Sequence, residues 1–525
     1  MPDAIIGVDA GTSMIKAVAF SAGGEPLATC RWDNAVLRPE PGWREQDMAD
    51  TWDATAATVR EVVEELESLD DDYEIQGLGI TGQGDGCWLV DDEGDPARDA
   101  ILWSDSRADG LIGEWQESSV NDDLYDICGS VQFPGSSLAI LLWLQDHEPE
   151  VVDRAETVFF CKDWLKYKFT GTICSDPSDM TLPYVDIEQG AYAPEVFEIV
   201  DAPEFEELLP PLADPLEIIG EVTVDAADQA GIPEGTPVVS GLFDVPASMF
   251  GTGVSEPGQG ASVVGTTSLN QVLLDEPDTS PHGVGYTLAL GLENRWSRFM
   301  ASMIGTPNLD WVLDKFRYRD DPDYPAIEKR VSEIPLGSDG VLYHPYLSSS
   351  GERAPFLNTK ARAQFIGLEP DHTESHLIRA VYEGVALAMK DCYEHIPDTP
   401  DEVYIAGGGA NSDFWCEMFA DMTDARFSVP EGEEFGAKGV AMLAATATGI
   451  YDDFETAIEE TRTISTSYEP RGDKTEQYDR LYEFYRSTYE TMFDVWDTRA
   501  ETLAALDAAR TEEKTTIPDA ETADS

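Results

Sequence analysis

Two segments of this chain repeat one local pattern, and the repeat limits the folds that the chain can adopt. Residues 5–20, IIGVDAGTSMIKAVAF, consist of an apolar stretch, a turn of small residues and a second apolar stretch. Residues 258–274, GQGASVVGTTSLNQVLL, follow the same order about half a chain later. Apolar runs bounded by glycine and polar residues predict strand, turn and strand. The repeat therefore predicts two related halves with a cleft between them.

Strand-like and helix-like segments alternate through the rest of the chain. Residues 48–68 place apolar side chains on one helical face, and residues 75–81 form a strand-like run. The segment EVYIAGGGANSDFWCEMFADM, residues 402–422, predicts a buried strand, a triple-glycine turn and a helix. Such alternation is typical of an α/β fold in which helices cover the sheets.

The length of 525 residues exceeds what one hydrophobic core usually supports, so at least two domains are expected. The loop-like residues 248–257 mark the expected boundary. We expect one domain at residues 1–250 and a second at 251–500, with a disordered acidic tail at 508–525.

Acidic residues greatly outnumber basic residues. The chain carries 103 Asp and Glu against 33 Lys and Arg, which gives a formal net charge of −70. A disordered acidic chain lacks aromatic residues, whereas this chain contains 12 Trp, 20 Phe and 19 Tyr and must have a core. Because the acid is spread along the whole chain, we interpret it as adaptation to a very salty cytoplasm that screens the repulsion. A protein whose acidic residues bind a basic partner would instead concentrate them in one tail. The negative net charge of this chain also argues against binding to nucleic acid or to anionic membranes.

The cysteines and the N-terminus indicate the compartment. The seven cysteines show neither paired spacing nor a metal-ligand pattern, so we expect reduced thiols inside a cell. The predicted first strand begins within four residues of the N-terminus, and no run of 18 apolar residues occurs. We therefore expect a soluble, cytoplasmic protein.

The opening turn is rich in hydrogen-bond donors. It lacks the patterns of a P-loop and of a dinucleotide-binding fold, but its small residues let backbone N–H groups approach an anion, and Thr12 and Ser13 add hydroxyls. Asp9 could hold a divalent metal. Taken alone, the turn is better explained as a structural hairpin. A second donor-rich turn at 265–268 and the glycines at 407–409 favour instead two phosphate-binding turns that flank a cleft for a triphosphate.

Several motifs give the chain a resemblance to the FGGY family of carbohydrate kinases, from about residue 4 to about residue 500. DAGTSMIK resembles the family's first phosphate motif, although Met14 stands where Gly is common. GWREQD at 42–47 and ILWSDSRA at 101–108 resemble two further family segments, and AQFIGLEPDHTESHLIRAVYEG at 363–384 resembles the C-terminal signature closely. One departure is Ile140, where the N-terminal signature usually has Lys. The resemblance implies two RNase H-like domains of the actin-like ATPase type, with the nucleotide and substrate cleft between them.

The resemblance also implies roles for individual residues. Asp244 in GLFDVPASMFG would be the catalytic base, which fits the need of phosphoryl transfer for a proton acceptor. Without the resemblance, a turn residue is the better explanation of Asp244. Asp9 and Asp244 would hold Mg²⁺. Lys16 would contact the phosphates or lie on a solvated strand face. The residues implied for binding ATP are Gly11, Thr12, Ser13, Lys16, Gly265, Thr266, Gly305, Gly408, Gly409 and Ala410.

Substrate specificity is expected in ITGQGDGCWLVD, residues 80–91. At this strand end, the xylulose kinases have a motif similar to Gln-Met-His-Gly, and the glycerol kinases have one similar to Gln-Arg-Glu. This chain has Gln83-Gly84-Asp85-Gly86 instead. A carboxylate can accept hydrogen bonds from two adjacent hydroxyls, so Asp85 suits a vicinal diol and Gly84 leaves room; the alternative is an ordinary loop acid. Trp103 would form an apolar wall or belong to the core. The implied substrate-binding residues are Gln83, Gly84, Asp85, Trp103 and Asp244.

Two further groups of charged residues have structural explanations. Asp105 and Arg107 are expected to form an ion pair. The loop SSSGERAPFLNTKARA, residues 348–363, gathers three cations and could favour phosphate, but a folded family loop explains it better.

These features predict an ATP- and Mg²⁺-dependent kinase acting on a terminal hydroxyl of a small sugar or polyol, such as the ketopentose xylulose or the tetritol erythritol. The segments QGDG and FDV resemble the erythritol and L-xylulose kinase branch. The alternatives are a glycerol kinase-like activity and an actin- or chaperone-like ATPase with a protein partner, and a homodimer is compatible with either. The residues from Gln83 to Asp85 and the C-terminal signature argue against the ATPase alternative.

Overall fold

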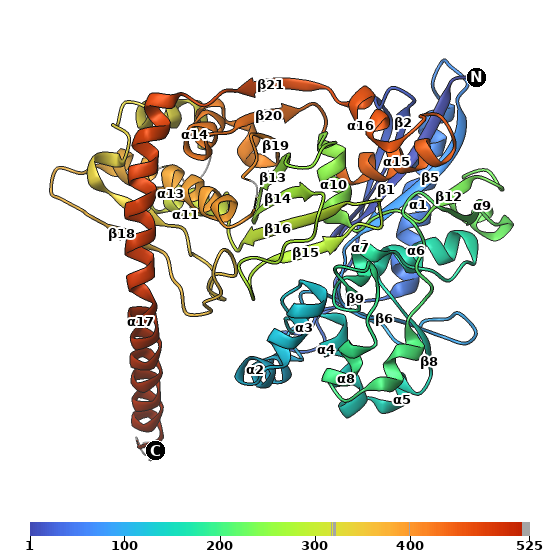
Figure 1. Cartoon of the computed structure of the whole chain (residues 1–525), viewed down its shortest axis with the longest axis horizontal. Coiled ribbons are helices and arrows are strands. Elements are labelled where there is room, and N and C mark those ends of the chain that lie inside the picture. The colour runs from blue at the N-terminus through green and yellow to red at the C-terminus, as the bar shows by residue number, and fades with distance from the viewer. Residues whose placement is uncertain (317, 319–321, 398, 517–525) are drawn as a thin grey trace, which may run out of the picture.

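Two β-sheets with helices packed around them form the protein (Figure 1). The structure is a computed structural model that describes residues 1–316, 318, 322–397 and 399–516, with side chains described to residue 508. The first sheet has the order β11-β12-β5-β1-β2-β3. Its strands are β1 (Asp3–Ala10), β2 (Met14–Ser21), β3 (Pro26–Asp33), β5 (Glu74–Gly82), β11 (Ile218–Glu221) and β12 (Pro237–Val239).

The second sheet repeats the arrangement of the first. Its order is β15-β16-β14-β13-β19-β20-β21. In each sheet the first strand of the hairpin pairs antiparallel with the second strand and parallel with a strand from later in the sequence, β5 beside β1 and β19 beside β13. The predicted duplication of an α/β unit is confirmed. The strands are β13 (Gly260–Val264), β14 (Ser268–Leu274), β15 (Tyr286–Ala289), β16 (Trp296–Ser302), β19 (Glu402–Ala406), β20 (Arg426–Pro430) and β21 (Ile464–Tyr468).

Helices α10 (Asp244–Thr252) and α15 (Phe435–Ala447) cross in close contact between the sheets. A Cβ on Gly439 would lie 2.0 Å from the carbonyl oxygen of Ala247, so only glycine allows this approach. α15 also packs on β1 and β5, where a Cβ on Gly7 would lie 1.9 Å from the carbonyl oxygen of Ala437. The division at residue 250 therefore remains a prediction, since α15 lies in the second half of the sequence but packs on the first sheet.

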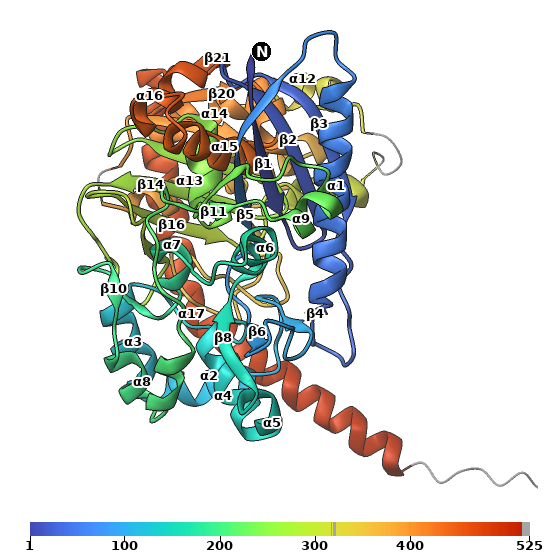
Figure 2. The ribbon, with the colours of Figure 1, turned by 90° about the vertical axis from the view of Figure 1, so that its right-hand side faces the viewer.

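A group of short helices and strands extends the first half beyond its sheet and carries the segments around residues 85, 103 and 132 (Figure 2). It contains β4 (Glu45–Gln46), β6 (Trp88–Asp91), β7 (Ala100–Ile101), α2 (Asp109–Glu117), α3 (Val120–Cys128), α4 (Ser137–His147), α5 (Pro149–Val152), β8 (Ala155–Phe159), α6 (Cys161–Thr170), α7 (Pro177–Met180), β9 (Val185–Asp186), β10 (Ala191–Tyr192) and α8 (Glu195–Ile199). α1 (Met48–Glu67) and α9 (Val224–Ala230) pack beside the first sheet.

The remaining helices and strands belong to the second half. α13 contacts α14, α11 and β17, and it is buried along most of its length. These elements are α11 (Pro307–Lys315), α12 (Tyr324–Val331), β17 (Leu342–His344), β18 (Gln364–Ile366), α13 (Glu374–Glu394), α14 (Asp413–Thr423) and α16 (Phe454–Thr461).

The last helix, α17 (Gly472–Thr516), is 45 residues long, and its final part projects away from the rest of the protein (Figures 1 and 2). One face of this helix packs against the core of the second half, where Tyr478, Tyr485 and Trp496 are buried. The expected disorder from residue 508 is corrected for residues 508–516, which are helical, and residues 517–525 lie outside the described part.

All seven cysteines are free thiols, as predicted. Among the described residues, no helix has both the length and the apolar character that a membrane-spanning helix requires.

Candidate active site

Asp9 lies near the end of β1, half-buried beside the N-terminus of α15. A Cβ on Gly436, at the start of α15, would lie 2.9 Å from Asp9 Oδ2 and 3.4 Å from Ser248 Oγ of α10. Burial raises the pKa of Asp9 to about 6, although the charge of Lys16, its partner across β1 and β2, lowers it. No local pattern indicated Gly436, because its contact with Asp9 exists only in the folded chain.

Lys16 forms an ion pair with Glu434, with 2.9 Å between Nζ and Oε2. Arg31 also donates a hydrogen bond to Glu434, at 2.9 Å from Nε to Oε1. The pair joins β2 to the segment before α15. It explains Lys16 without any ligand, so the phosphate-binding role of Lys16 stays a prediction.

Thr12, Gln83 and Trp103, which are far apart in the sequence, meet in one hydrogen-bonded chain. Trp103 Nε1 donates to Thr12 Oγ1 at 3.0 Å, and Thr12 Oγ1 donates to Gln83 Oε1 at 2.8 Å. Gln83 Nε2 donates to Gln46 Oε1 at 2.7 Å, and Gln46 Nε2 donates to the Thr12 carbonyl at 2.7 Å. The ring is closed by Gln46, a residue of the GWREQD segment that we did not predict as part of the site.

The segment around Asp85 is tightly packed. Asp85 adopts a left-handed backbone conformation with φ of 55°. A Cβ on the preceding Gly84 would lie 2.3 Å from the Phe243 ring and 2.7 Å from Asp179 Oδ1. The expectation that Gly84 leaves room is therefore wrong, because Phe243 and Asp179 fill the space that a side chain at residue 84 would take.

Asp244 is the first residue of α10 and is half-buried. Burial raises its pKa well above the ordinary value, and the charges of Asp9 and then Asp179 raise it further. A helix N-terminus favours a negative charge or an anionic ligand. Asp244 is thus a carboxylate of raised basicity with two other carboxylates within electrostatic reach.

Asp179 belongs to a fully buried charged cluster. Lys162 Nζ lies 2.9 Å from Asp163 Oδ1 and 2.5 Å from Asp179 Oδ2, and it also forms an ion pair with Asp176. The three carboxylates lie close enough together to hold a metal ion, but the Lys162 ammonium already lies among them. Burial alone would lower the pKa of Lys162, yet these three carboxylates raise it well above the ordinary value. In such an acidic chain, no spacing pattern distinguished this cluster.

The second donor-rich turn is held against two later segments. Gly305 N donates to the Thr266 carbonyl at 2.9 Å, and a Cβ on Gly305 would lie 2.5 Å from the Gly265 carbonyl oxygen. A Cβ on Gly408 would lie 3.9 Å from Thr306 Cγ2, and the backbone at Thr266 and Gly408 is exposed. The structure thus brings together residues predicted separately, namely Gly265, Thr266, Gly305, Gly408, and with them Gly409 and Ala410, which form the turn after β19.

α10 connects the two halves of the site. Its second residue, Val245, accepts a hydrogen bond at its carbonyl oxygen from Gln271 Nε2 of β14 at 3.2 Å. β14 begins directly after the second turn, whereas Asp244 lies within electrostatic reach of Asp9 at the first.

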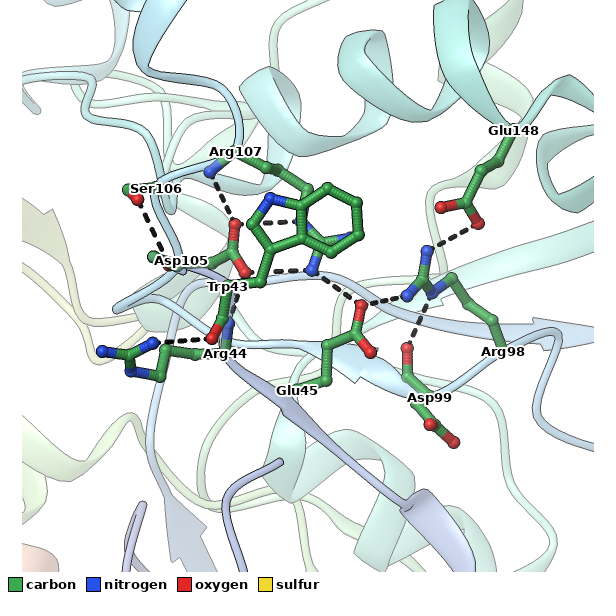
Figure 3. Close-up of polar contacts among 10 residues, drawn as sticks. Trp43, Arg44, Glu45, Arg98, Asp99, Asp105, Ser106, Arg107 and Glu148 are labelled. Carbon is green, nitrogen blue, oxygen red and sulfur yellow. Dashed lines mark hydrogen bonds and ion pairs between the residues drawn. The ribbon is translucent and has the colours of Figure 1, made fainter. Parts of the chain in front are cut away.

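The predicted ion pair of Asp105 and Arg107 is confirmed, and it belongs to a larger network of polar contacts (Figure 3). Arg107 Nη2 also donates to Glu45 Oε1 at 2.7 Å, and its guanidinium lies over the Trp43 ring, 4.1 Å from the centroid. Glu45 in turn pairs with Arg98. These buried contacts fix the segment that carries Trp103, and Gln46 is the next residue after Glu45.

Known proteins share both the sequence and the fold. The model of the FGGY family of carbohydrate kinases, N-terminal domain, matches residues 4–251, and that of the C-terminal domain matches residues 260–448. The erythritol kinase of Brucella abortus (strain 2308) is 32% identical over 510 residues, which cover 94% of this chain and 97% of that protein. The L-xylulose/3-keto-L-gulonate kinase of Escherichia coli (strain K12) is 28% identical over 488 residues, 92% of this chain and 95% of that protein. The crystal structure of a gluconate kinase from Lactobacillus acidophilus superposes with a TM-score of 0.88 at 21% identity, over 95% of this chain and 100% of that one. From its two matched halves, this chain belongs to the FGGY family of carbohydrate kinases.

Proposed function

We propose that this protein is an ATP-dependent kinase that transfers the γ-phosphoryl group to a terminal hydroxyl of a small polyol or ketose. The observation that carries the proposal is the position of Asp244 at a helix N-terminus, within electrostatic reach of Asp9. Its helix, α10, is also hydrogen-bonded to β14, the strand that follows the second turn. The names of the erythritol kinase and the L-xylulose/3-keto-L-gulonate kinase support this substrate class.

The residues fit a magnesium nucleotide. The two turns offer backbone N–H donors for phosphate oxygens, together with the exposed hydroxyls of Ser13, Thr266 and Thr267. The Asp9 carboxylate is an oxygen ligand of the kind that Mg²⁺ prefers. Asp9 and Asp244 would hold the ion, and the turn at Gly408–Gly409 would lie against the nucleoside. Bound ATP would supply the phosphoryl group, and the metal would neutralise its charge.

The residues of the chain would do the remaining work. Asp244 would orient the acceptor hydroxyl and receive its proton, for which a raised pKa is an advantage. Asp85 and Trp103 would bind the substrate, with Gln83 holding the first turn in place. Closure of the two halves around the ligands would exclude water and prevent hydrolysis of ATP.

To test this, the release of ADP from ATP by the purified protein is measured in molar KCl with each of a panel of candidate acceptors: tetritols, pentitols, ketopentoses and glycerol. We expect ADP release to depend strictly on an added polyol or ketose, and glycerol to be a poor substrate. ATP consumption that depends on a polypeptide, or polymerisation with ATP, would support the actin- or chaperone-like alternative instead. Glycerol as the best acceptor would support the glycerol kinase alternative.

We further propose that the protein works in a highly salty cytoplasm. This proposal is supported by the net charge of −70 and by acidic side chains on exposed faces, such as Glu61, Glu64 and Glu67 of α1. In dilute buffer the repulsion between these charges is unscreened, whereas at 1 M salt the Debye length is about 3 Å. We expect tryptophan fluorescence and circular dichroism to show loss of structure below a threshold of KCl. Equal ionic strength of NaCl should protect equally, and full stability in dilute buffer would contradict this proposal.

A further inference from the structure

We propose that the substrate site selects an open-chain polyol over the corresponding 2-ketose, through buried oxygen acceptors of Asp85 and Gln132 that only hydroxyl hydrogens can satisfy. This inference rests on the proposed kinase function and narrows its substrate class. It follows from side-chain oxygens that have no donor in the described part of the chain.

Asp85 has one oxygen that is buried and unpartnered. Its side chain accepts a hydrogen bond from the backbone N–H of Ser137, at the N-terminus of α4. Asp85 Oδ1 nevertheless has no donor within the described residues, although Asp85 is only 7% exposed. A buried carboxylate oxygen without a donor is costly unless a ligand supplies one.

Gln132 supplies a second acceptor of the same kind. It is 3% exposed, and its Nε2 donates to the Ser130 carbonyl at 3.1 Å. That bond fixes the orientation of the amide, because the reversed amide would point its oxygen at a carbonyl. Gln132 Oε1 is then a buried acceptor for which the described residues offer no donor.

The two acceptors lie on neighbouring segments. The loop that carries Gln132 contacts the loop of Asp85 through a hydrogen bond from Gly86 N to the Gly135 carbonyl at 3.0 Å. Cys128 connects them as well: its Sγ lies 3.9 Å from Gln132 Nε2, and the charge of Asp85 contributes to the raised pKa of its thiol.

Asp179 adds a third buried oxygen next to these segments. It is fully buried, its Oδ1 has no donor among the described residues, and it lies beside the backbone of Gly84. Asp179 also interacts electrostatically with Asp85. Buried oxygens without a donor are therefore concentrated around the loop that carries Gly84 and Asp85.

This chemistry discriminates between a secondary alcohol and a ketone. Each carbinol group of a polyol carries an O–H that can donate to Asp85 or Gln132. The carbonyl of a 2-ketose carries no hydrogen and would direct its own negative oxygen at these acceptors. A site built to bind a hydroxyl rejects an analogue that lacks it by orders of magnitude, because its own polar groups remain unpaired.

Two side chains that can donate hydrogen bonds, Tyr286 and Arg353, belong to the same part of the protein. Burial raises the pKa of Tyr286 to about 12, with the charge of Arg353 lowering it and that of Asp85 raising it. The Arg353 guanidinium packs over the Phe133 ring, 5.5 Å from the centroid. Neither donates to the free oxygens of Asp85 or Gln132. Because Arg353 could donate to a ketone oxygen instead, the experiment includes a variant that lacks its guanidinium.

The experiment compares kcat/KM for pairs that differ in oxidation at one carbon, erythritol with erythrulose and xylitol with D- and L-xylulose. With saturating ATP in molar KCl, we expect the best polyol to exceed its ketose by about 100-fold or more. A ketose used as well as its polyol would overturn the inference while leaving the kinase proposal intact. A folded protein that binds ATP but phosphorylates neither class would overturn both.

Variants connect the preference to these residues. Asp85→Asn gives the site an N–H donor, and we expect the polyol-to-ketose ratio to fall about tenfold or more. Gln132→Leu removes an acceptor and should lower kcat/KM for the polyol more than for the ketose. The matched control Asp214→Asn, at an exposed carboxylate of the same half, should leave the ratio unchanged.

Two outcomes would contradict the assignment. An unchanged ratio in both Asp85→Asn and Gln132→Leu, with the KM for ATP unaltered, would show that these oxygens do not bind the substrate. A wild-type preference for ketoses that disappears in Arg353→Met would assign the carbonyl to Arg353 and overturn the inference.

Discussion

Asp244→Asn is expected to lose phosphoryl transfer while it still binds ATP. The amide has nearly the same shape as the carboxylate, but it cannot receive the proton of the acceptor hydroxyl. A positioned base contributes about 10²- to 10⁴-fold to the rate, so we expect kcat to fall by that factor. Initial rates of ADP release give kcat, and calorimetric titration with ATP in the absence of acceptor gives nucleotide affinity, which should change only a few-fold.

The matched control is Asp225→Asn, at an exposed carboxylate in the first turn of α9. It alters a helix N-terminus in the same half of the protein without approaching the site, and its kinetics should equal those of the wild type. Near-wild-type transfer by Asp244→Asn would remove Asp244 as the base. Loss of ATP binding in that variant would assign it to the nucleotide and metal instead.

Lys162→Met is expected to destabilise the fold severely. It leaves the carboxylates of Asp176 and Asp179 buried without their cation, while Asp163 keeps Lys166 at 3.0 Å. Breaking a buried ion pair from one side costs about 3–5 kcal/mol. Urea unfolding in molar KCl should show this loss in the free energy of unfolding.

The pH dependence of this variant follows from the remaining carboxylates. Burial raises the pKa of Asp179 to about 7 in the presence of Lys162, and loss of the cation raises it further. A carboxyl group with a folded pKa above its unfolded value favours folding below the unfolded pKa, and that contribution is lost as pH rises through the folded pKa. The destabilisation should therefore be larger at pH 8 than at pH 5.

Two variants serve as controls for Lys162→Met. Lys329→Met, at an exposed lysine of α12, should change the free energy of unfolding by less than about 0.5 kcal/mol. Adding Asp179→Asn to Lys162→Met should restore part of the stability, since it removes one uncompensated charge. A loss in Lys162→Met no larger than that in Lys329→Met would show that the cluster contributes little.

The sequence was sufficient for those parts of the site that lie on local motifs. The two strand–turn–strand units, the triple-glycine turn and the ion pair of Asp105 and Arg107 each depend on residues close together in the chain, and the structure has all of them. Gly305 packs against the second turn, whereas its place beside the nucleotide stays a prediction.

The contacts that the sequence did not reveal join distant segments. Gly436 and Glu434 meet Asp9 and Lys16 from the far end of the chain, and Asp179 fills the space beside Gly84. Local patterns carry no information on such pairs, and in a chain with 103 acidic residues the identity of Asp179 is no signal. The space beside a glycine can be judged only from its neighbours, which is why the room expected at Gly84 was wrong.

The return of α15 to the first sheet has a consequence for biosynthesis. The ribosome makes β1, β2 and β5 first, whereas α15, which covers β1 and β5 and lies beside Asp9, is made only after residue 434. A nascent chain that lacks α15 can therefore form the first hairpin but cannot complete the surroundings of Asp9. The site cannot act on ATP until α15 has been made and has packed on the first sheet.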